Sequence, residues 1–144
     1  AQLQIWTAHC TERVSKEYYR ALVAQDNESE ENALKQFYKE CISLARAMDD
    51  EGPFFLGKEF CIVDVALAPF WQRITTVGKH YMDLDLSTIE EGKEEFARLD
   101  EWWQATKERP SIKNTICCPE RMISTYQDYS RGEATSDAAK NFIK

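Results

Sequence analysis

The stretch GPFFLGKEFCIVDVALAPFWQR, residues 52 to 73, decides the fold of this chain. From Cys61 to about Val77 nearly every residue is apolar, so a helix here has hardly any polar face. A helix that is apolar all round belongs in the interior of a protein. The sequence therefore predicts a buried central helix. We expect a kink or a loosened turn at Pro69, because proline removes a backbone donor and collides with the preceding turn.

The start of this central helix carries the residue types of a capping motif. Phe60, Cys61 and Asp64 have the offsets of a staple residue, an N-cap and an acid at the third helical position. We expect Phe60 to pack against Val65, and the Asp64 carboxylate to accept hydrogen bonds from free backbone donors. A carboxylate at the positive end of a helix stabilises it by about 0.3 to 2 kcal/mol, which assigns these residues to folding rather than to chemistry.

The remaining apolar residues recur at helical spacing on both sides of this stretch. These stripes predict helices over residues 2–25, 34–48, 96–106 and 119–129. The chain has only five glycines and four prolines, and no segment is typical of a strand. The prediction is an all-α bundle that fills residues 1–144 as a single domain. Its polar tail begins at about residue 132, is expected to fray, and has only Phe142 and Ile143 as anchors.

Charge and composition narrow the range of partners. Eighteen basic residues against 25 acidic ones give a net charge of -7, which disfavours nucleic acid and anionic membranes. No apolar run approaches the roughly 18 residues of a membrane span, and no basic segment followed by an apolar one opens the chain. The five cysteines lack CxxC spacing and a histidine cluster. Neither a metal site nor a disulfide framework is therefore indicated, and a cytoplasmic location fits best.

The motifs closely resemble the glutathione transferase family, and within it the omega class and its fungal relatives. The helical half of that family carries a Ser/Thr-x-x-Asp capping box at its central helix, which corresponds to residues 61–64 here. Further agreement lies in YRALVAQD at 19–26, EGPFFLG at 51–57, ALAP at 66–69 and RPSIKNT at 109–115. The resemblance covers nearly the whole chain. It implies the helical C-terminal fold of that family, built around a buried central helix.

Cys61 departs from the capping box, because a thiol is a far weaker acceptor than a hydroxyl. The cap is weakened by up to about 1 kcal/mol if the thiol behaves as an alanine replacement does. Two interpretations of Cys61 stay open. It is either a packing residue or a reactive cysteine, since helix N-termini lower thiol pKa values. Burial beside Phe60 and the nearby Asp64 oppose the second interpretation.

The resemblance implies an enzyme with glutathione as co-substrate, in which a cysteine of a thioredoxin-like N-terminal half forms a mixed disulfide with glutathione. These 144 residues lack the pattern of that half, so the chain has the features of a fragment or isolated domain. We expect it to have no catalytic residue, no activity and no glutathione binding by itself, and to be monomeric. In the family, the helical half lines the site for a hydrophobic or disulfide substrate and contributes to a homodimer. By resemblance, the candidates for the substrate wall are Tyr18, Tyr19, Phe70, Arg73, Met122, Tyr126 and Tyr129.

Both the roles of single residues and the function of the whole chain stay open at this point. Phe70 and Tyr18 are either part of the substrate wall or core residues, because a packed core produces the same helical spacing of aromatic residues. Arg73 can hold an anionic substrate group, or it can simply pair with an acid. At the level of the whole chain, the same helical domain serves as a noncatalytic docking module in translation factors and synthetase assemblies. The fold alone does not separate that function from an enzyme.

Overall fold

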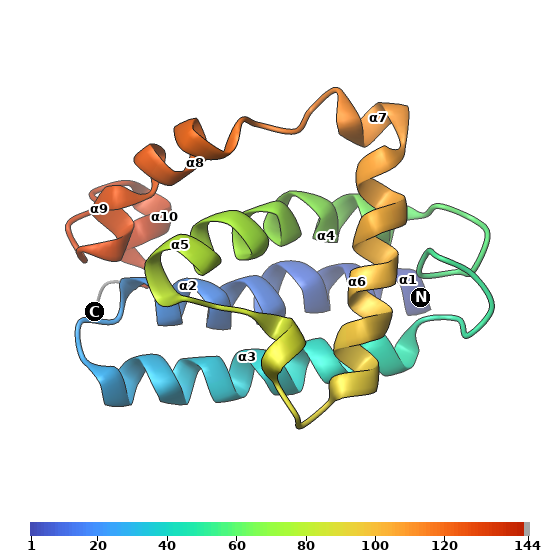
Figure 1. Ribbon diagram of the computed structural model, residues 1–144, viewed down its shortest axis with the longest axis horizontal. Coiled ribbons are helices and arrows are strands. Elements are labelled where there is room, and N and C mark those ends of the chain that lie inside the picture. The colour runs from blue at the N-terminus through green and yellow to red at the C-terminus, as the bar shows by residue number, and fades with distance from the viewer. Residues whose placement is uncertain (143–144) are drawn as a thin grey trace.

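The computed structural model describes residues 1–142, and the chain begins with a long helical rod. This rod consists of α1 (Gln2–Ala8), a π-helical stretch (His9–Val14) and α2 (Ser15–Val23). After the turn, the Asp26 carboxylate caps α3 (Asn27–Ala47) by accepting a hydrogen bond from the Ser29 backbone N–H at 2.8 Å. α2 and α3 pack along each other in opposite directions (Figure 1). The helix predicted over 34–48 is confirmed, but α3 begins earlier than predicted, at Asn27.

The central helix begins where the sequence predicts and continues further than expected. It consists of α4 (Ile62–Arg73), a π-helical turn (Ile74–Gly78) and α5 (Lys79–Met82). α4 runs through Pro69, which lies on an exposed face of the helix. The sequence predicts a loosened turn at Pro69, but the structure has it after the end of α4, in the π-helical turn Ile74–Gly78.

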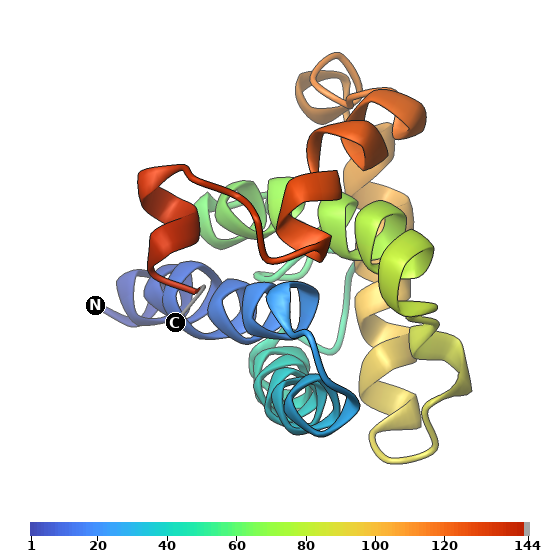
Figure 2. The same ribbon diagram turned by 90° about the vertical axis from the view of Figure 1, so that its left-hand side faces the viewer.

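The rest of the chain wraps around this helix. It forms a short 3-10 turn (Leu86–Thr88), α6 (Lys93–Glu108), α7 (Pro110–Lys113), α8 (Pro119–Thr125), α9 (Gln127–Ser130) and α10 (Asp137–Lys140). α6 crosses α3 and α4 steeply, and the C-terminal helices return over the end of α2 (Figures 1 and 2). The single helix predicted over 119–129 is wrong, because the backbone leaves helical geometry at Tyr126.

The predicted tail is partly docked. The Ser136 hydroxyl caps α10 by accepting from the Ala139 backbone N–H at 3.1 Å. The Ala139 side chain is fully buried, and the Phe142 ring stacks on Tyr19 with centroids 5.2 Å apart. Ile143, the other predicted anchor, lies outside the described residues.

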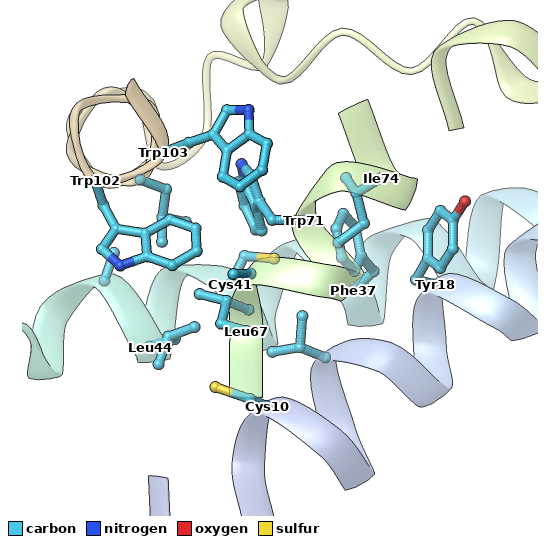
Figure 3. Close-up of a cluster of buried hydrophobic side chains, with 14 of the residues drawn as sticks. Cys10, Tyr18, Phe37, Cys41, Leu44, Leu67, Trp71, Ile74, Trp102 and Trp103 are labelled. Carbon is cyan, nitrogen blue, oxygen red and sulfur yellow. The ribbon is translucent and has the colours of Figure 1, made fainter. Parts of the chain in front are cut away.

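The core lies between the rod, α3, the central helix and α6 (Figure 3). Trp71 of α4 packs edge-on against Trp102 of α6, with ring centroids 5.9 Å apart. Tyr18 and Phe37 fill the space between α2 and α3, and both are fully buried. The interior is made of large side chains from all four units, which confirms the central helix. Its burial is one-sided, because Ile62, Val65 and Pro69 of α4 are exposed.

The carboxylate of Asp64 connects the turn before α4 to the core. It accepts hydrogen bonds from the Cys61 backbone N–H at 2.7 Å, the Phe55 backbone N–H at 2.9 Å and the Trp102 indole N–H at 2.8 Å. The first of these bonds confirms the predicted capping role. The other two join the 52–60 loop and α6 to the same side chain, and no local motif predicts them.

The loop that precedes α4 explains the glycines of the EGPFFLG motif. Phe54 and Gly57 exchange two backbone hydrogen bonds, which closes a tight turn. Gly57 has a φ of +79°, and a Cβ atom on Gly52 would lie 2.4 Å from the Gly57 carbonyl carbon. Both positions therefore require glycine.

Phe60 packs in this loop differently from the prediction. Its ring lies edge-on against Phe54 at 5.2 Å between centroids, and the Arg109 guanidinium lies 4.1 Å above it. Val65, its predicted partner, is about half exposed, with 47% of its surface accessible. Arg109 follows α6 in the chain, so Phe60 joins the loop to the end of α6.

Among the described residues, none of the helices is both long and apolar enough to cross a membrane.

Candidate functional site

Five of the seven candidate residues lie together where α8 and α9 meet α2 and α4. We call this group the aromatic cluster, and its members are Tyr19, Phe70, Arg73, Tyr126 and Tyr129. Helical spacing on α4 places Phe70 and Arg73 on one face, three residues apart. Tyr126 reaches that face because the chain returns over it after α7 (Figure 2), and Tyr129 packs against Tyr126 and Tyr19.

Hydrogen bonds fix the polar atoms of the aromatic cluster. The Arg73 Nε donates to the Tyr126 hydroxyl at 2.5 Å, and a terminal nitrogen of the same guanidinium donates to the Pro69 carbonyl at 2.6 Å. The hydroxyl of Tyr126 also pairs with that of Tyr19 at 3.1 Å. The hydrogen-bonded series Arg73, Tyr126 and Tyr19 therefore joins α4, the junction between α8 and α9, and α2.

Arg73 is a half-buried cation without a carboxylate partner among the described residues. Its guanidinium carbon lies 5.8 Å from the ring centroids of both Phe70 and Tyr126, within the range of a cation–π interaction. Burial on its own lowers the pKa of Arg73. The phenol groups of Tyr126 and Tyr19 outweigh that effect, so the pKa is raised and the guanidinium stays charged.

The phenols of Tyr18 and Tyr19 stay protonated at neutral pH. Burial raises the pKa of Tyr19 and of Tyr18, and the hydrogen bond with Tyr126 adds to the rise at Tyr19. A neutral phenol both donates and accepts hydrogen bonds. The aromatic cluster can therefore stack with a flat apolar group and hold an anionic group at Arg73, but it holds no activated nucleophile.

The two other candidates occupy buried positions next to the cluster. Tyr18 is fully buried, packs edge-on against Tyr19 at 5.3 Å, and donates from its hydroxyl to the Arg73 carbonyl at 3.2 Å. Met122 is the buried residue of α8, with 7% of its surface accessible. The geometry of Tyr18 agrees with a packing role, because its ring is closed off from solvent.

Sequence reasoning missed one member of this region. The Phe142 ring stacks on Tyr19 and covers it from the side of the tail. Its signal in the sequence is an aromatic residue within a polar segment, which by itself predicts only an anchor for the tail. Phe142 anchors the tail at the aromatic cluster itself.

Burial keeps three of the five thiols, Cys10, Cys41 and Cys61, in the protonated form. All five cysteines are free. Burial raises the pKa of Cys10 to about 12, with contributions from Asp64 and Cys61, and burial also raises the pKa of Cys41. Burial raises the pKa of Cys61 as well, which opposes the interpretation of Cys61 as a reactive thiolate. No group of three or more potential metal ligands gathers within residues 1–142.

Comparison with known proteins decides the family. The model of the glutathione S-transferase C-terminal domain matches residues 14–115, which is more than half of the chain. The chain belongs to the glutathione S-transferase C-terminal domain family. The matched range contains α2 through α7, and therefore the central helix and its Asp64 cap, while α8 to α10 lie beyond it.

Individual glutathione transferases agree with this assignment. The chain is 31% identical over 93 residues to glutathione S-transferase L2, chloroplastic, of Arabidopsis thaliana, which covers 65% of the chain and 30% of that protein. The crystal structure of glutathione transferase Omega 3C from Trametes versicolor superposes with a TM-score of 0.75 at 27% identity, over 94% of the chain and 55% of that protein. The trimeric glutathione transferase TDR1 of Leishmania superposes with a TM-score of 0.70 at 20% identity, over 89% of the chain and 28% of that protein, and this match shows the fold alone.

These matches confirm the predicted fold and the resemblance to an omega-class fungal protein. The glutathione transferase domain described here spans about a third of the Arabidopsis relative and about half of the Trametes one. Membership implies that relatives use glutathione. The name of the Arabidopsis relative places that protein in the chloroplast, so the cytoplasmic location of this chain stays a prediction.

Proposed function

We propose that this chain is the helical half of an omega-like glutathione transferase, and that the aromatic cluster forms part of the wall of its hydrophobic-substrate site. The observation that carries this proposal is Arg73, a half-buried cation between two aromatic rings that has no carboxylate partner within residues 1–142. Buried charges are normally paired, so a charge held only by neutral groups is poised for an external anion. A substrate with a flat ring and a carboxylate matches both features.

The remaining half of the enzyme is proposed to be a thioredoxin-like domain that binds glutathione and carries the catalytic residue. The Trametes relative supports this proposal, because the matched region is only 55% of that protein. On this chain, Ile5 of α1 and both Ile62 and Val65 of α4 expose apolar side chains. α1 packs against α4, so these residues offer an apolar face for a second domain.

In the complete enzyme we propose glutathione as the co-substrate, a homodimer as the assembly and the cytoplasm as the location. The present chain alone is then monomeric and without glutathione affinity, because the other half supplies the glutathione contacts and much of the dimer interface. Calorimetric titration of the isolated chain with glutathione tests this expectation. Micromolar binding would contradict it, and so would a tight dimer in light scattering.

The test of the substrate wall uses the complete enzyme and two mixed disulfides of glutathione, one with 4-mercaptobenzoate and one with uncharged 4-mercaptotoluene. Both place an aryl ring at the site, but only the first carries a carboxylate for Arg73. Arg73→Met is expected to raise KM for the benzoate substrate about five- to tenfold, the effect of losing one charge-assisted contact of about 1 to 1.4 kcal/mol. KM for the toluene substrate should change little.

The matched control is Arg121→Met, which removes an exposed arginine of α8. It should leave KM for both substrates unchanged. An equal loss with the two substrates in Arg73→Met would mean that the guanidinium only supports packing. If Arg73→Met leaves KM unchanged for both substrates, the aromatic cluster is not part of the substrate site.

A noncatalytic docking module remains the second candidate, and the exposed apolar face of α1 and α4 is the observation that favours it. The mass of the endogenous protein separates the two candidates. An immunoblot band at the 16.7 kDa of this chain supports the docking module. A band heavier by about 80 to 100 residues, the size of a small additional domain, supports the transferase.

A further inference from the structure

The ring of Tyr19, at the centre of the aromatic cluster, is already stacked by a residue from the tail. Phe142 lies nearly parallel to it, with centroids 5.2 Å apart and an interplanar angle of 28°. Tyr126 is nearly parallel too, at 6.2 Å and 26°, while Phe70 and Tyr18 meet the ring edge-on. A ligand ring that stacks on Tyr19 therefore competes with a parallel neighbour for the same ring.

Of the two parallel neighbours, Phe142 is held more weakly. The Tyr126 hydroxyl accepts a hydrogen bond from Arg73 and pairs with the Tyr19 hydroxyl, so Tyr126 is fixed at its polar end. A phenylalanine ring has no hydrogen-bonding group, and within residues 1–142 the ring of Phe142 pairs with that of Tyr19 alone. Displacement of Phe142 costs one aromatic pair, whereas displacement of Tyr126 also breaks two hydrogen bonds.

The segment that carries this phenyl ring, residues 133–142, has few contacts with the helices. It turns back after α9 towards the rod (Figure 2), and Ala139 is its only buried residue. One backbone hydrogen bond to α9, at 2.9 Å, and one between the hydroxyls of Ser136 and Tyr129, at 2.8 Å, join it to the rest of the described chain. Segments with so few buried contacts open locally at a small fraction of the cost of global unfolding.

The place that Phe142 occupies opens onto a hollow of about 360 Å³. Gly132 and residues 23–26, in the turn between α2 and α3, form part of its lining. Small-molecule sites in proteins usually measure about 300 to 1,000 Å³. A ligand that takes the place of Phe142 therefore has room beside it.

We propose that residues 133–142 are a displaceable cover on the aromatic cluster, and that Phe142 competes with the aromatic ring of a substrate for Tyr19. This role of Phe142 rests on the substrate wall proposed above. With the cover closed, Phe142 occupies Tyr19. With the cover open, the ligand ring takes that place while its anionic group lies at Arg73. The affinity for a flat anion is therefore lowered by the fraction of the protein in which the cover is closed.

Calorimetry on the 144-residue chain tests the competition with two ligands that share a flat ring system, 2-naphthoate and its neutral analogue 2-naphthamide. Phe142→Ala should bind both about fivefold more tightly than the parent chain, the effect of removing one competing aromatic pair. Phe142→Trp carries a larger competing ring and should bind both more weakly than the parent chain. Phe142 is only partly buried, so the fold tolerates both changes.

Two further variants separate the cover from the substrate wall. Thr135→Ala changes an exposed residue of the same segment and should leave both affinities unchanged. Arg73→Met should weaken naphthoate and leave naphthamide unaffected. If Arg73→Met affects neither ligand while Phe142→Ala still tightens both, the cover stands and the role of Arg73 in the wall is contradicted. Unchanged, weaker or absent naphthoate binding in Phe142→Ala would overturn the cover, while the response to Arg73→Met still reports on the wall.

Hydrogen exchange gives a second readout on the parent chain. The Ala139 backbone N–H donates to the Ser136 hydroxyl at 3.1 Å inside the segment, so its exchange rate reports how often the segment opens. Saturating naphthoate should speed up this exchange, because the ligand displaces the cover. Slower exchange would mean that the segment closes over the bound ring instead, and that outcome would overturn the competition.

Discussion

Each end of α4 has a charged side chain, and the two side chains differ in burial and in their hydrogen-bond partners. At the start, the fully buried Asp64 carboxylate accepts three hydrogen bonds from the chain. At the end, the half-buried Arg73 guanidinium uses two donors on neutral oxygens and has no counter-ion among the described residues. A guanidinium has five N–H donors, so its capacity is not filled.

This difference separates a structural charge from a candidate binding charge. Asp64 has no free lone-pair direction facing solvent, and its partners come from the preceding loop, the helix start and α6. Its contacts therefore serve folding, as the capping motif predicts. Arg73 faces aromatic rings at the edge of the bundle, where an external anion can reach it. Experiments that remove one charge at a time can test this contrast.

The largest expected effect is loss of stability when Asp64 is replaced. Asp64→Ala leaves the Phe55 N–H and the Trp102 indole N–H without acceptors, and buried unsatisfied donors cost about 1 to 3 kcal/mol each. We expect the free energy of unfolding to fall by about 3 to 5 kcal/mol, measured by urea denaturation. The matched control is Asp100→Ala on the exposed face of α6, expected within about 0.5 kcal/mol. Equal losses in the two variants would contradict the contrast.

The next effect is a loss of stability at alkaline pH. It arises from Cys10, a buried thiol whose pKa is also affected by Asp64 at the start of α4. Burial raises the pKa of Cys10 from 9.0 to about 12, and Asp64 adds to the rise. The folded pKa lies above the unfolded one, so the unfolded thiol ionises first. Stability is therefore complete below about pH 9 and falls as pH rises towards about 12, by about 2 kcal/mol between pH 9 and pH 10.5.

Urea denaturation at these two pH values measures that loss. Cys41, Tyr18 and Tyr19 contribute to the same fall, because burial raises their pKa values too. Cys10→Ala isolates the Cys10 thiol, since it removes one titrating group and leaves Cys41 and the phenols. A pH dependence as steep in Cys10→Ala as in the parent chain would show that Cys10 does not carry the effect.

The sequence was most informative where the interactions are local. The apolar run after Cys61 predicts the buried central helix, and the offset from Cys61 to Asp64 predicts the cap, because both depend on neighbours along one helix. The position of Phe60 could not be predicted, because its partner Arg109 lies far along the chain, just after α6. The Trp102 bond to Asp64 has the same origin.

The candidate site shows the same limit. Family resemblance gave its residues, and helical spacing places Phe70 and Arg73 on one face. The hydrogen bond between Tyr19 and Tyr126 joins residues 107 positions apart, and no local pattern encodes it. The π-helical turn after Arg73 also has no residue signal comparable to a proline, so the loosened turn was predicted at Pro69 instead.

A smaller loss of stability is expected near Arg73, at the other end of α4. Tyr126→Phe keeps the ring and removes the hydroxyl that accepts from Arg73 and pairs with Tyr19. We expect a loss of about 1 kcal/mol, a typical value for one partly buried hydrogen-bonded group. Tyr129→Phe is the control, because its hydroxyl meets only Ser136 at an exposed position, and it should cost less than about 0.5 kcal/mol. Equivalent losses would mean that the Arg73 network adds nothing.

The smallest expected effect is a gain of stability at Cys61, which occupies the N-cap position of α4. The thiol is a weak acceptor for the Asp64 backbone N–H, and a hydroxyl of similar size accepts it better. Cys61→Ser should raise the free energy of unfolding by up to about 1 kcal/mol, while Cys61→Ala should not. The difference between these two variants isolates the cap from the lost sulfur contacts. If serine and alanine are equally stable, the start of α4 depends on the Asp64 carboxylate alone, and the contrast with Arg73 rests on that one side chain.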